Sequence, residues 1–200
     1  DQHGPGRVLF RNTRLAMSGF PKRIAHIVPI QAEENQSLWV ERARNEFSYD
    51  KGIVSIPKSE QEFWFNEDPC VKWLLKEMKE LHPAKILLIC STKEKVLALE
   101  SALSKLTALK VGVFHEDLTL VQRDKNAAWF AEQDGAELLL CSEIGSEGRN
   151  FQFAHHLILF DIPLHPELLE QRIGRLDRIG QKQDIDIYIP YLVDSPQGIL

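Results

Sequence analysis

Residues 86–114 read ILLIC-STKEKVLALESALSKLTALK-VGVF, and this stretch decides the fold. Its first five residues are all apolar, as expected for a strand that is covered on both faces of a sheet. Residues 91–106 then place apolar side chains at helical spacing, at Val96, Leu99, Leu103 and Leu106. Residues 111–114 form a second short strand pattern. This order predicts two parallel strands joined by a right-handed helical crossover.

The same alternation continues on both sides of this stretch. On the N-terminal side, Asp68 and Pro69 suit the cap and the first position of a helix that runs to residue 81. On the C-terminal side, Thr119 and Gln122 form a capping-box pattern before another helix. A short helix is expected at residues 166–176, and further strands are expected at residues 138–141, 157–160 and 185–193. The pattern predicts a parallel α/β sheet with helices on both faces, whose ligands gather at the carboxyl ends of the strands.

Residues 1–66 lack this pattern. They carry glycine, proline and basic side chains near the beginning, and only residues 37–47 indicate a helix. We therefore expect an irregular segment over residues 1–67 and an α/β domain over residues 68–200. Since the chain begins at Asp1 and ends at Leu200 without a tail, we expect it to be part of a longer protein.

The composition narrows the classes of function. The chain is 44% hydrophobic and 26% charged, which are globular proportions that rule out wholesale disorder. Its 24 basic and 29 acidic residues give a formal charge of −5, so a polyanion would have to bind a local basic patch. The three cysteines are scattered without a CxxC pair, which favours a reducing compartment such as the cytoplasm. No apolar run approaches the roughly 18 residues of a membrane span.

Several nucleotide-binding and metal-binding patterns are absent. The sequence contains neither a P-loop nor a G-x-G-x-x-G turn after a strand. No cluster of His, Cys, Asp or Glu has the spacing of a metal site. Asp161 follows the apolar run at 157–160, as the magnesium-binding Asp of P-loop enzymes does. Without a P-loop partner, we interpret Asp161 as a turn residue at a strand end.

One loop with a specific composition is CSEIGSEGRN, at residues 141–150, directly after a predicted strand. Gly145 and Gly148 permit positive φ and a close approach of the backbone. Successive backbone N–H groups in such a loop can bind phosphate. The alternative is an ordinary strand-to-helix loop with turn glycines.

A second such loop is QRIGRLDRIGQ, at residues 171–181. Arg175 and Arg178 are three residues apart, so on a helix they would project from the same side. A pair of guanidinium groups beside Gly174 suits a triphosphate, because each planar fork can bind two phosphate oxygens. The alternative is a solvated helix end in which Asp177 is the internal partner of the arginines.

The second loop resembles a known family. Four residues match the last motif of the superfamily-two helicases and translocases: Gln171, Gly174, Arg175 and Arg178. Residues 145–150 resemble the motif before it. The continuation over residues 178–181 is similar to the SWI/SNF-type branch, because the DEAD-box branch usually closes this motif with a second Gly-Arg pair. Two positions depart from the family pattern, Asp117 and His165.

Further segments extend the resemblance. Residues 114–116 and Arg123 resemble the element that follows the second strand of the family's C-terminal lobe. Residues 9–14 and 20–22 are similar to the segment that links the two lobes. Within the SWI/SNF-type branch, residues 142–153 and 174–181 most resemble the bacterial members that associate with RNA polymerase.

The resemblance implies a fold and a function. The fold would be a three-layer RecA-like lobe, the helicase C-terminal domain of a P-loop NTPase-like enzyme, with residues 1–67 as an interlobe connector and family-specific insertion. The complete protein would be an ATP-hydrolysing DNA or RNA translocase that binds RNA polymerase and promotes its recycling in transcription, in the bacterial cytoplasm at the nucleoid. The P-loop and the magnesium site would belong to the first RecA-like lobe, so the 200 residues alone would be inactive.

The resemblance also implies roles for nine residues. Arg175 and Arg178 would act as arginine fingers on the γ-phosphate of ATP. Four residues would bind nucleotide or couple it to the nucleic acid: Gln171, Glu147, Gly148 and Asn150. Three residues would contact the nucleic-acid backbone: Thr92, Arg123 and Ser142. No residue of this lobe would bind a metal. Two other interpretations stay open, a DEAD-box-like RNA helicase lobe and a non-catalytic RecA-like docking module for a partner protein.

Overall fold

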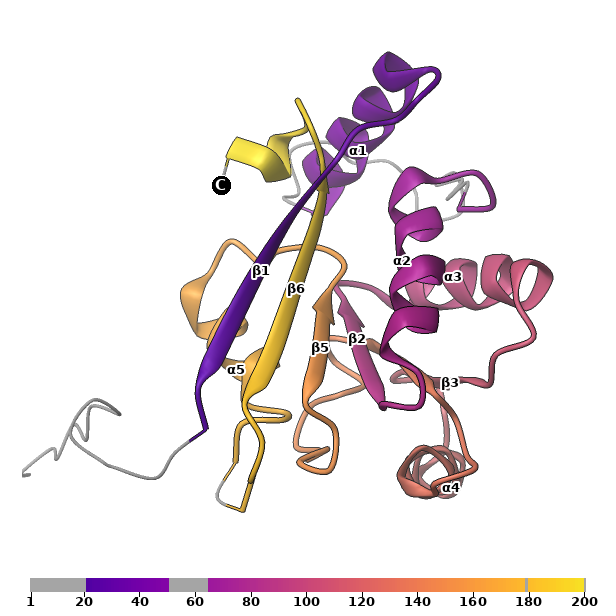
Figure 1. Ribbon diagram of the computed structural model, residues 1–200, viewed down its shortest axis with the longest axis vertical. Helices are drawn as coiled ribbons and strands as arrows, with labels where there is room; N and C mark the ends of the chain where they lie inside the picture. The colour runs from indigo at the N-terminus through magenta and orange to yellow at the C-terminus, as the bar shows by residue number, and fades with distance from the viewer. Residues whose placement is uncertain (1–20, 51–64, 179, 200) are drawn as a thin grey trace, which may run out of the picture.

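The structure is a computed structural model that describes residues 21–50, 65–178 and 180–199 (Figure 1). Its elements, in chain order, are β1 (Arg23–Ile30), α1 (Gln36–Asp50), α2 (Pro69–Leu81), β2 (Ile86–Cys90), α3 (Lys93–Leu106), β3 (Val111–Phe114), α4 (Leu120–Ala131), β4 (Leu138–Ser142), β5 (His156–Leu159), α5 (Pro166–Ile173), β6 (Ile185–Leu192) and the 3-10 helix η3 (Pro196–Ile199).

The six described strands form one sheet in the order β1-β6-β5-β2-β4-β3. Every neighbouring pair is parallel. The predicted parallel α/β sheet is therefore confirmed, and all six strands end at the same edge. β2 and β4 lie inside the sheet and are buried along their whole length, which is why their sequences are apolar except for Ser142 at the end of β4.

Helices cover both faces of the sheet. Successive side chains of a strand point to opposite faces, so Leu88 joins a core cluster with residues of α2 and α3. Leu87 and Ile89 point the other way, into a cluster with residues of α4 and α5. The chain thus has three layers, with α2 and α3 on one side and α4 and α5 on the other (Figure 1).

Local sequence signals start three of the helices, two of them as predicted. The Asp68 carboxylate accepts a hydrogen bond of 2.6 Å from the Cys70 N–H at the start of α2, and Pro69 occupies the first turn. Thr119 and Gln122 form a reciprocal capping box at the start of α4. Thr92 caps α3. His165 precedes α5 without a capping hydrogen bond from its side chain, in keeping with its departure from the family pattern.

The prediction that residues 1–66 are irregular is wrong for β1. This strand pairs with β6 over eight residues, from Arg23 opposite Ile185 to Ile30 opposite Leu192 (Figure 1). It is an edge strand with Ile27 60% exposed, so its sequence lacks a clear inward and outward alternation. Pro29 interrupts the strand pattern, as proline does on edge strands.

The rest of the N-terminal segment is partly described. The helix predicted at residues 37–47 is confirmed within α1, whose Trp39 packs with Ile30 and Leu192 at the ends of β1 and β6. The linker resemblance at residues 9–14 lies outside the described residues, as does most of the remaining segment at 51–64. In the part of the chain that the structure describes, no helix is long and apolar enough to cross a membrane.

Candidate functional site

The carboxyl ends of the strands bring distant loops together. After β2, the backbone N–H and the hydroxyl of Ser91 each donate a 2.9 Å hydrogen bond to Oδ2 of Asp161, which follows β5. At the end of β4, the Ser142 hydroxyl donates a 2.6 Å bond to the carboxylate of Glu116, which follows β3. The two specific loops of the sequence both lie at this edge.

The glycine-containing loop after β4 is shaped by its two glycines. The N–H of Gly145 donates a 2.9 Å bond to the Ser142 hydroxyl, and a Cβ at Gly145 would lie 2.5 Å from Cα of His115. Gly148 has a φ of +71°, with open space around the position of a Cβ. The first glycine is therefore required by a close approach of two backbones, and the second by the backbone conformation.

The arginine-containing loop continues from the end of α5. The helix ends at Ile173, earlier than the predicted residue 176, and Arg175 lies in the tight turn that follows. In this turn the Arg175 N–H donates to the carbonyl of Arg172 at 3.1 Å, and Nε of Arg178 donates to the carbonyl of Gly174 at 2.9 Å. The turn, and not a continuous helix, brings the two arginines together.

Both arginines line one surface depression of about 310 Å³. It is bordered by Glu170, Gln171, Gly174, Arg175, Asp177 and Arg178. Arg178 is exposed, whereas Arg175 is 7% exposed. Three of the predicted site residues, Gln171, Arg175 and Arg178, thus line one open depression.

Arg175 forms no ion pair in the described part of the lobe. Across residues 21–50, 65–178 and 180–199, no carboxylate forms an ion pair with Arg175, and its buried Nε has no hydrogen-bond partner. Burial, followed by the charge of Arg178, lowers the pKa of Arg175, and the nearby carboxylates of Glu147 and Glu143 oppose this shift only in part. A guanidinium that is partly buried and forms no ion pair favours binding an anion.

The two acidic side chains that line the depression are bound by another cation. Arg23 of β1 donates to Oδ2 of Asp177 at 2.6 Å and to both carboxylate oxygens of Glu170 at 2.9 Å. Asp177 was the internal partner considered for the arginine pair, and it is bound by Arg23 instead of forming an ion pair with Arg175. β1 therefore contributes to keeping the arginine depression electropositive.

Asp161 has a larger role than the sequence predicts. The interpretation as a turn residue gave its position at a strand end correctly, but its side chain is a buried counter-ion. Nζ of Lys95 lies 3.1 Å from its Oδ2, and Nη1 of Arg172 lies 3.0 Å from its Oδ1. Burial opposes the ionised form, but Lys95 and Arg172 outweigh it and hold the pKa of Asp161 well below its ordinary value.

Lys95, Arg172 and Glu143 are further members of this network that the sequence analysis missed. Nη2 of Arg172 lies 2.8 Å from the Glu143 carboxylate. The partners are 29 and 66 residues apart for the Arg172–Glu143 and Lys95–Asp161 pairs, so no local pattern links them. The sequence indicated only one member of the network, because Arg172 is an arginine inside the segment 171–181.

The three residues predicted to contact nucleic acid lie at the same edge. Thr92 accepts a hydrogen bond from the Lys95 N–H, and Arg123 donates to the carbonyls of Leu118 and Glu116. Ser142 is almost fully buried. Glu147, Gly148 and Asn150 are exposed on the neighbouring loop. The nucleic-acid contacts of the first three residues and the coupling role of the last three stay predictions.

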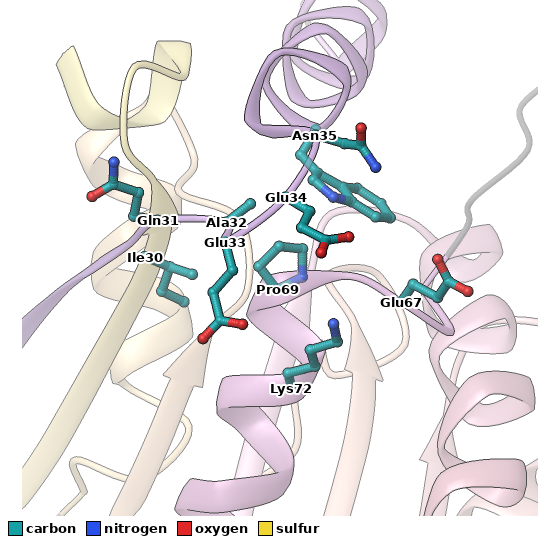
Figure 2. A pocket seen from close by; sticks show the side chains of 10 residues that line it. Ile30, Gln31, Ala32, Glu33, Glu34, Asn35, Glu67, Pro69 and Lys72 are labelled. Carbon is teal, nitrogen blue, oxygen red and sulfur yellow. The ribbon is translucent and has the colours of Figure 1, made fainter.

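A second cavity, of about 460 Å³, lies between the end of β1 and the start of α2. Figure 2 shows the carboxylates of Glu33, Glu34 and Glu67 around it, with Lys72 as the cation among the side chains that line it. This acidic lining does not suit a phosphate. Among the described residues, no group of three or more His, Cys, Asp and Glu could hold a metal ion. The arginine depression is therefore the candidate anion site.

Comparison with known proteins identifies the family to which the chain belongs. Residues 70–180 match the family described as the helicase conserved C-terminal domain. The chain is 50% identical over 199 residues to the RNA polymerase-associated protein RapA of Pseudomonas fluorescens (strain Pf0-1). It is 46% identical over 213 residues to the protein of the same name from Vibrio cholerae serotype O1 (strain M66-2). These matches confirm the predicted resemblance.

The matches cover 98% and 100% of this chain but 21% and 22% of the two relatives. The chain thus spans about a fifth of the length of the curated relatives that it matches.

Two solved structures confirm the fold as a RecA-like lobe. The C-terminal part of the Fun30 ATPase domain superimposes with a TM-score of 0.70 at 14% identity, covering 90% of this chain and 87% of that one. The Sulfolobus solfataricus SWI2/SNF2 ATPase core in complex with dsDNA gives a TM-score of 0.64 at 17% identity, covering 86% of this chain and 42% of that one.

Proposed function

The chain belongs to the helicase conserved C-terminal domain family, and from this membership we propose that it is the second RecA-like lobe of an ATP-driven translocase that works with RNA polymerase. In this proposal, ATP lies between this lobe and a first lobe of the same protein. Arg175 and Arg178 would complete the ATP site from the second lobe.

The observation that carries the proposal is that Arg175 forms no ion pair in the described part of the chain. The residue is 7% exposed, its buried Nε has no hydrogen-bond partner, and it borders an open depression beside Arg178. A triphosphate would supply the missing negative charge. The donor set is cationic and planar, which fits phosphate oxygens. Magnesium would be held by the first lobe, and ATP would supply the phosphoryl bond that is broken.

The two arginines would act most strongly in the transition state. Charge shifts onto the transferring phosphoryl group and the leaving oxygen, and a desolvated guanidinium stabilises it. An arginine finger typically contributes about 10³–10⁵ to the rate, or roughly 4–7 kcal/mol of barrier. Gln171, which borders the same depression, would orient the turn or contact the nucleotide.

The loop after β4 would couple the nucleotide to a nucleic-acid track. Glu147, Gly148 and Asn150 are exposed on it, and Arg149 forms a 2.8 Å ion pair with Asp124 of α4. Thr92, Arg123 and Ser142 would contact the backbone of DNA or RNA. Phosphate contacts carry no sequence information, as a translocase requires, and the SWI2/SNF2 relative solved with dsDNA supports such a track.

The relatives also support the choice of partner and compartment. Because two proteins that match the whole chain are named as RNA polymerase-associated, we assign RNA polymerase as the partner of the complete protein, and recycling of the polymerase as its task. The protein would then work in the bacterial cytoplasm at the nucleoid. Within residues 1–67, β1 belongs to the sheet of this lobe, the residues before it would serve as the connector between the lobes, and α1 would be part of a family-specific insertion.

The proposal is tested in the two-lobed protein with Arg175→Ala and Arg178→Ala. Each change should lower ATP turnover at saturating ATP by about 10³-fold or more, while the affinity for nucleotide changes little. Arg44→Ala is a matched control, because Arg44 is an exposed arginine on α1, away from the depression. Near-normal turnover in both depression variants would overturn the assignment and favour a non-catalytic docking module.

A further inference from the structure

Helix α1 is connected to the arginine turn by a row of buried charges. Its last residue, Asp50, places Oδ2 at 2.6 Å from Nζ of Lys95 on α3. Lys95 in turn lies 3.1 Å from Oδ2 of Asp161, whose other oxygen lies 3.0 Å from Nη1 of Arg172. Four charges of alternating sign thus join α1, α3, the end of β5 and α5.

The last member of this row fixes both specific loops. Nη1 of Arg172 donates to the backbone carbonyl of Asp161 at 2.6 Å, and Nη2 donates to Glu143 in the loop after β4 at 2.8 Å. The carbonyl of Arg172 accepts the N–H of Arg175 at 3.1 Å. A shift of Arg172 would therefore move the start of the arginine turn and the glycine loop together.

Because most of the row is buried, the loss of any one of its charges should disturb the others. The side chains of Lys95, Arg172 and Asp161 are 2%, 2% and 6% exposed. Burial disfavours charged Lys95, but Asp161, Glu46 and Asp50 outweigh it and raise its pKa. Since a buried charge cannot stay unpaired without a large cost, loss of one carboxylate should rearrange the remaining pairs.

Asp50 is the accessible end of the row. Its side chain is 21% exposed and it borders a cavity of about 230 Å³, which is also lined by Ser91, Asp161 and Arg172. The cavity leaves room for the row to change its arrangement. A substitution at Asp50 can therefore perturb the row of charges without leaving a cavity in the hydrophobic core.

We infer that α1 is a positioning element for the catalytic turn, and that Asp50 acts through Lys95 and Asp161 to hold Arg172, and with it Arg175, in the geometry that ATP hydrolysis needs. The inference rests on the proposed function and adds positioning residues to it. None of these four network residues needs to touch the nucleotide.

The test uses Asp50→Asn in the two-lobed protein, with Asp50→Glu as the variant that restores the carboxylate. Asp50→Asn should lower kcat for ATP hydrolysis about 3- to 20-fold, the range of coupling through packed networks, with the affinity for ATP within twofold of wild type. Asp50→Glu should recover most of the loss. The control is Glu41→Gln on the same helix, because Glu41 is exposed and has no ion pair in the described part of the chain.

A double variant separates positioning from a general loss of stability. In an Arg175→Lys background, which keeps a measurable rate, Asp50→Asn should cause little further loss, because both changes act on the same turn. Fold-losses that multiply, a loss of ATP affinity in place of kcat, or a wild-type rate in Asp50→Asn would each overturn the inference. If Arg175→Ala also kept its full rate, the proposed function itself would fail, so the two failures are distinguishable.

Discussion

Nζ of Lys95 lies 3.1 Å from Oδ2 of Asp161, and both side chains are almost completely buried. The two residues are 66 positions apart and come from α3 and from the loop after β5. Asp161 also forms an ion pair with Arg172, so this one carboxylate contacts two buried cations at the edge of the sheet where the candidate site lies.

Removing that carboxylate should destabilise the fold strongly. Asp161→Ala leaves the charges of Lys95 and Arg172 buried with one anion fewer, and we expect a loss of about 3–5 kcal/mol in the free energy of unfolding. Urea denaturation of the 200-residue chain measures it. Asp117→Asn is the control, because Asp117 pairs with Lys93 at the exposed surface and should leave the midpoint unchanged. Equal midpoints for the two variants would contradict this account.

The two glycines of the loop after β4 should differ in their sensitivity. Gly145→Ala forces a Cβ to 2.5 Å from Cα of His115, and this overpacking should cost about 3 kcal/mol. Gly148→Ala meets no neighbour but keeps a φ of +71°, which should cost about 1 kcal/mol. Urea denaturation of both variants should give this order, and the reverse order would show that the loop is built differently.

The stability of the chain should fall in mild acid because of His156. Burial and the neighbouring His155 lower its pKa to about 4, more than Asp186 raises it, with His26 lowering it further. The unfolded chain takes up this proton near pH 6.5, and the folded chain does not. Lowering the pH from 7 to 5.5 should therefore cost about 1 kcal/mol of stability through this residue.

This pH effect can be assigned by substitution. The Tyr188 hydroxyl lies 3.4 Å from Nδ1 of His156, and Asp186 lies 3.8 Å from the same nitrogen. His156→Gln cannot be protonated, so the variant should lose less stability between pH 7 and 5.5 than the wild type. The same loss in both proteins, measured by urea denaturation, would remove His156 as the cause.

The 200-residue chain should not hydrolyse ATP by itself. It contains no P-loop sequence, and its candidate site supplies cations from one side only. Phosphate release from the purified chain with ATP and magnesium should stay at the background rate, whereas the two-lobed protein should be active in the same assay. Robust magnesium-dependent hydrolysis by the purified chain would contradict the half-site interpretation.

Most of the fold could be predicted from the sequence because its signals are local. The apolar run at 86–90 and the capping box of Thr119 and Gln122 each give an element within a few residues of its observed bounds. β1 could not be predicted, because its order comes from pairing with β6, which follows about 155 residues later.

The candidate site was predictable in part for the same reason. Arg175 and Arg178 lie in one short motif, so their proximity could be expected from the sequence, although a turn and not the expected helix brings them together. The ion pairs on either side of this motif could not be predicted. The sheet order brings Arg23 to Asp177, and Lys95 to Asp161, and no local spacing encodes that order.

In the proposed mechanism, Arg175 stabilises the transition state of ATP hydrolysis more than it stabilises bound nucleotide. The most direct measurement compares the binding of ADP with that of ADP and vanadate, which mimics the transferring phosphoryl group, in the two-lobed protein. Arg175→Ala should weaken binding of the mimic by about 10³-fold and binding of ADP by less than about threefold, and Arg44→Ala should change neither. An Arg175→Ala protein that binds the mimic as tightly as the wild type would contradict the claim.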